Sequence, residues 1–235
     1  MLVRPPSRKS AHARGFSLIE LMVVVMLIGI LSAIALPSML QGQIDRHVYG
    51  DAVAINDLIR EARMRAIGRG GAVMVAMSTA AGSPGTFIAY EAVQPNPQTG
   101  GANSVPRSSC KAPTDWSLNT TAAGAAQSAT QLDSVVLGAY EVSNGISTTI
   151  YSSSTGTLSA QATEYLCFTP LGRTYAVEGG AIQAGMFNNA LPMTDAIQIQ
   201  VARLSGASPV GIVRSVLIPP NGVARLLSSA NLVAP

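Results

Sequence analysis

One uninterrupted apolar run near the start of the chain constrains folding more than any other feature. Residues 16–36 read FSLIELMVVVMLIGILSAIAL and contain a single charged residue, Glu20. As a helix this run would be about 31 Å long at 1.5 Å per residue, which matches the hydrocarbon thickness of a bilayer. The sequence therefore predicts a membrane-spanning helix over residues 16–36.

Four basic residues and no acid precede the run, namely Arg4, Arg8, Lys9 and Arg14. A basic start stays on the cytoplasmic side while the rest is translocated, so we expect a single-pass protein with its N-terminus inside and its globular part outside the membrane. A secretory signal peptide is the alternative interpretation. The length of the run, the absence of a small-x-small site directly after it and its continuation through Pro37 favour an anchor.

The first fifteen residues also account for the positive charge of the chain. The 235 residues are 48% hydrophobic and 11% charged, with a formal net charge of +3. Residues 16–235 hold 11 Lys and Arg against 12 Asp and Glu. This composition excludes a disordered polyelectrolyte, and the overall charge is no indication of a polyanion-binding protein.

Glu20 is costly inside a membrane helix. A carboxylate at that depth costs about 2.5–3.5 kcal/mol on insertion scales unless it is paired or protonated. Cleavage before Phe16 would create an α-ammonium four residues from Glu20. Because that amine could pair with Glu20 of a neighbouring subunit, we expect Glu20 to register subunits in an assembly.

The residues around this junction resemble a known processing motif. Residues 14–21, RGFSLIEL, are similar to the processing site of type IV prepilins and type II secretion pseudopilins. The resemblance implies that a prepilin peptidase removes residues 1–15 by cutting after Gly15 and methylates Phe16, and that Glu20 guides docking. It also implies major and minor pilin-like subunits and an inner-membrane assembly platform as partners.

A helical extension is expected over residues 37–70. Its apolar residues, at spacings of four and three, form one narrow stripe: Val48, Ala52, Ile55, Ile59, Ala62 and Ala66. Gly68 and the Gly70–Gly71 pair predict its end. Because the stripe lasts under three heptads, we expect packing against the chain's own sheet, with a coiled coil as the alternative.

Four arginines lie near the end of this helix: Arg60, Arg63, Arg65 and Arg69. They fall on several sides of it, so a solvated face is the expected arrangement and a phosphate-binding patch the alternative.

Residues 71–235 predict a β-rich globular domain. Eight strand candidates alternate apolar and polar residues or are rich in β-branched ones: 73–77, 86–93, 148–151, 165–169, 174–177, 196–204, 211–218 and 223–227. Turn signals at residues 170–172 and 219–222 predict hairpins. The expected fold class is α+β and pilin-like, with a long N-terminal transmembrane and amphipathic helix packed on one or two antiparallel β-sheets.

Further segments resemble the GspH/FimT branch of the pilin-like families. They are residues 59–67 (IREARMRAI), residues 168–173 (FTPLGR) and the last hairpin with residues 222–225 (GVAR). This resemblance implies a minor pilin or pseudopilin that initiates or caps a type IV pilus or type II secretion pseudopilus.

Residues 94–131 form a Pro/Gly/Ser/Thr/Ala-rich insertion with one aromatic residue, Trp116. A mobile surface insertion is the expected arrangement, and docking on a neighbour through Trp116 is the alternative. Cys110 and Cys167 would be exported to an oxidising compartment, where a disulfide would close about 57 residues and stabilise the fold by about 4 kcal/mol. Two free cysteines, with Cys167 buried, are the alternative.

No pattern predicts catalysis, a cofactor or a metal. The chain contains no G-x-S-x-G, Walker or H-E-x-x-H pattern. His47 is the only histidine after residue 15, and Asp45 near it is expected to face solvent. The sequence therefore favours a structural protein over an enzyme.

DNA binding during natural transformation is the alternative function. Some FimT-like subunits take part in DNA uptake through a C-terminal Gly-Arg-x-Arg motif, of which this chain has Arg225 but Val223 in place of the first arginine. The candidate phosphate-binding residues are Arg173, Arg203, Arg214 and Arg225, provided that they converge.

Overall fold

The structure is a computed structural model in which the chain forms two compact units, residues Met1–Gln43 and Ile44–Pro235. It describes residues 16–79, 85–95, 98, 104–111, 116, 129–137, 146–152, 159–180, 182, 185–205 and 208–229.

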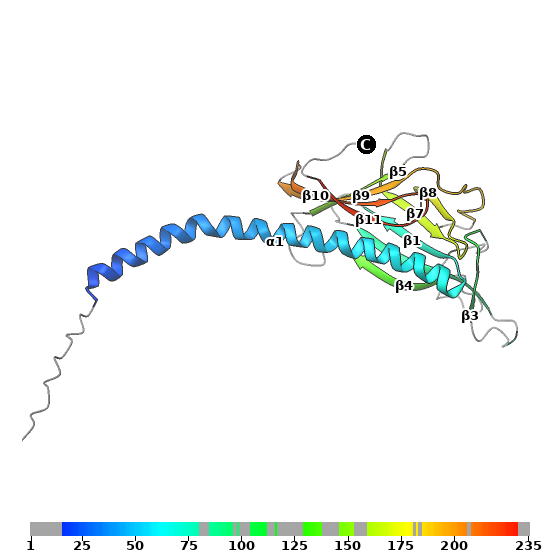
Figure 1. Cartoon of the computed structure of the whole chain (residues 1–235), viewed down its shortest axis with the longest axis horizontal. Helices are drawn as coiled ribbons and strands as arrows, with labels where there is room; N and C mark the ends of the chain where they lie inside the picture. Colours follow the sequence, from blue (N-terminus) through cyan, green and yellow to red (C-terminus); the bar gives the residue numbers. More distant parts are fainter. Residues whose placement is uncertain are drawn as a thin grey trace, which may run out of the picture. The chain divides into compact units, whose positions relative to one another are not determined.

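The first unit contains the beginning of the long helix α1 (Leu18–Arg69) (Figure 1). Residues Leu18–Ala35 have a mean hydropathy of 2.7 and none of this segment is buried. In the described part of the chain, this is the one helix long and apolar enough to cross a membrane. The finding agrees with the span expected from the apolar run.

In the second unit, the remainder of α1 presents the predicted stripe to the protein interior. All six stripe residues, from Val48 to Ala66, are at most 2% exposed. The helix ends at Arg69, where Gly70 adopts a φ of 71° and its N–H donates a hydrogen bond to the Ala66 carbonyl at 3.1 Å. A glycine relieves the strain of this left-handed position, so the predicted helix end is confirmed.

The strands form two antiparallel sheets. The first sheet has the order β3-β2-β1-β7-β8, with β4 also paired to β2, and the second has the order β11-β10-β9-β5-β6. The strands of the first sheet are β1 (Val73–Ser78), β2 (Thr86–Pro95), β3 (Ser104–Pro106), β4 (Ala129–Val136), β7 (Thr163–Phe168) and β8 (Thr174–Glu178). Those of the second are β5 (Ile146–Ser152), β6 (Ser159–Gln161), β9 (Ile197–Ser205), β10 (Ser208–Ile218) and β11 (Arg225–Ser229).

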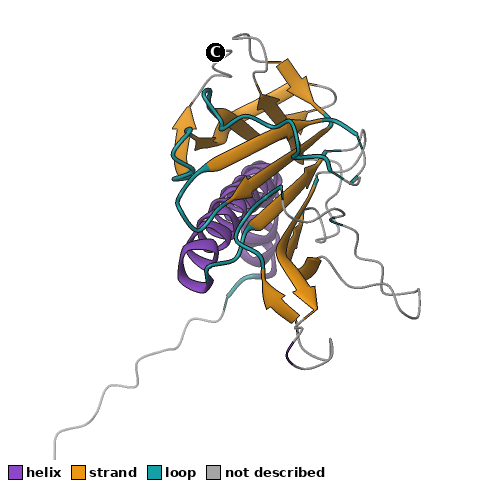
Figure 2. Ribbon diagram, turned by 90° about the vertical axis from the view of Figure 1, so that its right-hand side faces the viewer, coloured by secondary structure: helices purple, strands orange, loops and turns teal. Residues whose placement is uncertain are grey.

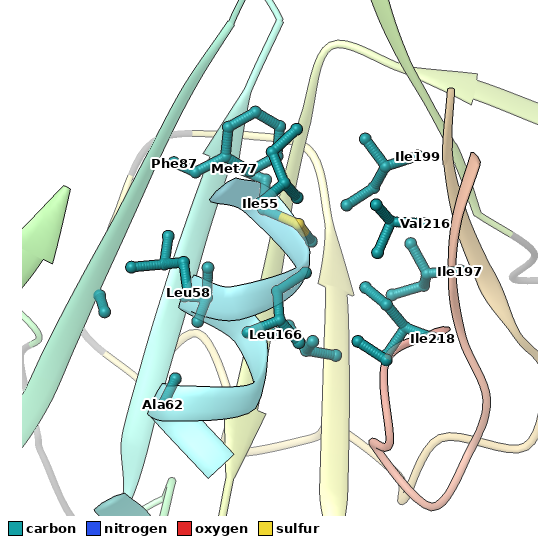
Figure 3. Close-up of a cluster of buried hydrophobic side chains, with 14 of the residues drawn as sticks. Ile55, Leu58, Ala62, Met77, Phe87, Leu166, Ile197, Ile199, Val216 and Ile218 are labelled. Carbon is teal, nitrogen blue, oxygen red and sulfur yellow. The ribbon is translucent and has the colours of Figure 1, made fainter. Parts of the chain in front are cut away.

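The main core lies where α1 and the inner faces of both sheets meet (Figures 2 and 3). Ile55 and Leu58 of α1 pack beside Leu166 of the first sheet, and Ile199 and Val216 approach from the second. The helix stripe therefore packs against the chain's own sheets, which confirms the expected α+β arrangement. Hairpins β7–β8 and β10–β11 form at the two predicted turns.

A second, smaller core covers the outer face of the first sheet. Cys110 and Cys167 are joined by the expected disulfide, with their Cα atoms 6.1 Å apart. Trp116 is 1% exposed, and its indole N–H donates a hydrogen bond to the Cys110 carbonyl at 3.3 Å. Its ring meets that of Phe187 edge-on, with centroids 6.0 Å apart.

The expectation of a loose insertion over residues 94–131 is wrong for the parts that the structure describes. β3 pairs with β2, the disulfide attaches Cys110 to β7, and β4 begins inside this stretch at Ala129. Trp116 is buried in its own chain, so it is not a docking residue for a neighbour. The composition of the segment did not indicate these contacts. A few buried residues can hold a segment in place even when its apolar residues follow no regular spacing.

Candidate processing and assembly site

The expected processing site lies at the boundary of the described residues. Gly15 falls outside them. Phe16 is 82% exposed and lies two residues before Leu18, the first residue of α1. Glu20 is exposed in the first turn, in which the Leu21 N–H donates a hydrogen bond to the Ser17 carbonyl at 3.2 Å. A carboxylate there is favoured by the unpaired N–H groups of the helix start.

The large apolar side chains from Leu18 to Ile34 are exposed in the first unit. From Leu18 to Ile34, the large hydrophobic residues range in exposure from 45% at Val24 to 79% at Leu18. Exposed apolar surface on this scale marks contact with lipid or with other protein. The segment therefore has the properties of both a membrane anchor and an assembly surface.

Two of the four candidate DNA-binding arginines face α1. Arg203 Nε lies 3.2 Å from Asp45 Oδ1, and its side chain is 16% exposed. Arg214 stacks over the Tyr49 ring, with its guanidinium carbon 5.3 Å from the ring centroid. The expectation that Asp45 only faces solvent is corrected, since it holds Arg203 against the helix.

The other two arginines are exposed: Arg173 directly precedes β8, and Arg225 is the first residue of β11. The turn before β11 fits closely against the β7–β8 hairpin, because a Cβ on Gly222 would come within 2.7 Å of side-chain atoms of Phe168 and Thr174. From α1, the Arg63 Nε–H donates a hydrogen bond to the Asn221 carbonyl at 3.2 Å. The first contact brings the two hairpin ends together, and the second holds the β10–β11 turn to α1.

The four arginines do not form one cluster. Arg214 shares its strand face with the core residues Val216 and Ile218, whereas Arg225 pairs with Leu217 and points to the opposite face. The structure thus places Arg203 and Arg214 at α1, and Arg173 and Arg225 at the hairpin ends.

A buried carboxylate that the sequence did not single out binds two arginines of α1. Glu91 on β2 is 3% exposed, with Arg65 Nη2 at 3.6 Å and Arg69 Nε at 3.1 Å from its carboxylate oxygens. Arg65 and Arg69 were expected on a solvated face. Their side chains remain 34% and 54% exposed, but both also form an ion pair with the buried carboxylate, which the sequence did not indicate.

A second buried carboxylate, Glu164 on β7, lies opposite Glu178 of β8. Glu164 is fully buried, and Glu178 is half-buried. Burial, reinforced by the negative charge of Glu178, raises the pKa of Glu164 from 4.5 to about 8, while the Ser152 hydroxyl acts in the opposite direction. No sequence pattern indicated this pair.

An open pocket of about 320 Å³ lies between β8, the end of β5 and the residues that lead into β9. Its lining includes Ser152 at the end of β5, Ala176 of β8 and Asp195 of the loop before β9. Among the residues that the structure describes, no three His, Cys, Asp or Glu side chains form a group that could hold a metal ion.

Residues 10–36 match the family model of the prokaryotic N-terminal methylation motif. The match covers the expected cleavage junction, Glu20 and the apolar span, and it supports a type IV pilin-like protein made as a prepilin. No curated protein and no solved structure matches the chain.

Proposed function

We propose that the chain is a structural subunit of a type IV pilus or type II secretion pseudopilus, processed by prepilin peptidase at Gly15–Phe16. The observation that carries the proposal is the methylation motif over residues 10–36, together with the unburied apolar helix Leu18–Ala35. After processing, the amine of Phe16 would pair with Glu20 of a neighbour.

A minor role, at the initiation or tip of the fibre, is the finer proposal. It rests on the likeness of residues 59–67 and 168–173 to the GspH/FimT branch. The position of the mature protein follows from the same proposal: an inner-membrane anchor, a periplasmic globular domain and then the fibre.

Processing is tested by producing the full chain in cells with and without a prepilin peptidase. Mass spectrometry should then find a shortened chain that begins at Phe16 and carries one methyl group, only where the peptidase is present. Gly15→Val should remain uncleaved, and Gly29→Ala serves as a matched control inside the span. Full-length product from the unsubstituted chain in peptidase-containing cells would refute the proposal.

Assembly is tested separately with Glu20→Gln, which retains the shape of the side chain but removes its charge. This variant should still be cleaved but should no longer crosslink to pilin-like subunits in membranes. Unchanged crosslinking would remove Glu20 from the docking step without affecting the processing result.

DNA binding is a second candidate function. It is favoured by the exposure of Arg173 and Arg225 on two hairpin ends that contact each other. Binding of the full chain in detergent to duplex DNA should weaken with salt, and Arg173→Gln with Arg225→Gln should weaken it further. Arg203→Gln, at the ion pair with Asp45, is the control expected to bind as the unsubstituted chain does.

A further inference from the structure

Glu164 occupies a position where an ionised carboxylate is poorly accommodated. It lies on the same face of β7 as Leu166 and Phe168, both of which belong to the main core. Its side chain is therefore directed toward the seam where β7 of the first sheet approaches β5 of the second. Burial of a charge in such a place is costly unless an opposite charge accompanies it.

Among the described residues, the groups that face Glu164 from β1, β8 and β5 include no cation. The register places Met77 of β1 on one side and Glu178 of β8 on the other. From the second sheet, β5 contributes the uncharged hydroxyl of Ser152. The ionisable group nearest in the ladder is thus a second carboxylate, which opposes ionisation of the first.

We propose that Glu164 and Glu178 form a proton-dependent latch, in which a protonated Glu164 keeps the seam between β7–β8 and β5 closed and its ionisation loosens that seam. With Glu164 neutral, the pair carries at most one negative charge. Once both are ionised, two adjacent carboxylates repel each other and draw water into the seam.

The pocket beside the seam provides the place where water would enter. Ser152 lines this pocket and also influences the Glu164 carboxyl, and Ala176 lies between Thr174 and Glu178 on β8. Hydration can therefore spread inward from the pocket along β5 and β8, without separation of the main core at α1.

The direction of the pH effect follows from the raised pKa of Glu164. The closed state retains the proton up to about pH 8, whereas an opened, hydrated Glu164 releases it near its ordinary value of 4.5. Opening is then favoured as pH rises between these values, by up to about tenfold in the opening constant per pH unit.

The test is hydrogen exchange of the full chain in detergent micelles at pH 6, 7 and 8, corrected for the intrinsic exchange rates. In the unsubstituted chain, the opening constants of β7, β8 and β5 amides should rise by up to about tenfold per unit, and those of β10 should not change. Glu164→Gln should remove the rise, and Glu178→Gln should reduce it. Glu61→Gln, on the exposed face of α1, should leave it unchanged.

The latch would be overturned by the same pH dependence in Glu164→Gln as in the unsubstituted chain. If that variant also exchanged faster by one factor at every pH, Glu164 would act only through packing.

Discussion

Glu91 of β2 and Glu164 of β7 are buried carboxylates that lie beside opposite ends of the central strand β1. β1 pairs with β2 at Val73 and Glu91, and with β7 at Met77 and Glu164. The end of α1 brings Arg65 and Arg69 to Glu91, whereas β8 places a second carboxylate, Glu178, opposite Glu164. Glu91 is paired with cations, whereas in the proposed latch Glu164 is neutralised by binding a proton.

This difference shows that two equally buried carboxylates can have neighbours of opposite charge. Both side chains are at most 3% exposed, and at Glu164 burial together with the nearby Glu178 carboxylate raises the pKa to about 8. The sign of the neighbouring charges separates the two positions. The position with cations joins helix to sheet, and the position without them makes the sheet seam sensitive to pH.

The largest effect on stability is expected when both arginines that pair with Glu91 are replaced. Arg65→Gln with Arg69→Gln leaves a buried, unpaired carboxylate, so we expect the free energy of unfolding at pH 7 to fall by about 3 kcal/mol. Chemical denaturation of the full chain in detergent measures it. Adding Glu91→Gln should recover most of the loss, since no buried charge would then remain. A loss without this recovery would show that the arginines act through packing.

A smaller effect is expected when Glu164 is given a cation. Glu178→Lys places an ammonium opposite Glu164, so the pKa of Glu164 should fall. The chain should then gain about 1 kcal/mol of stability at pH 9; the gain is small because this position is partly exposed to solvent. Denaturation at pH 6 and pH 9 measures the change, with Glu178→Gln as the neutral control. Equal effects of Lys and Gln would show that loss of repulsion, and not the new attraction, is decisive.

The smallest effect on stability is expected when only Arg69, one of the two arginines that pair with Glu91, is replaced. Arg69 is 54% exposed in its side chain, so Arg69→Gln should cost under about 1 kcal/mol, and less in 1 M salt. Denaturation in low and high salt, beside Arg60→Gln on the same helix, measures it. A cost that salt does not reduce would contradict a screened ion pair.

Several features of this protein could be predicted from local sequence patterns. The apolar span, the six-residue stripe, the helix end at Gly70 and the hairpins after β7 and β10 each depend on residues close together in the chain. Their physical causes are local periodicity, turn geometry and apolar length. The strands β3, β4 and β6 were missed because β3 and β6 are only three residues long and β4, with largely exposed side chains, shows little burial pattern.

The tertiary structure alone decided which charges meet. Glu91 is 26 residues from Arg65, and Arg203 is far along the chain from Asp45, so no spacing rule connects them. The same holds for the burial of Trp116 by Phe187 and for the register that sets Glu164 opposite Glu178. Local periodicity selects a helix or a strand and the face that it buries, but the energy of a charge depends on the neighbours that packing supplies.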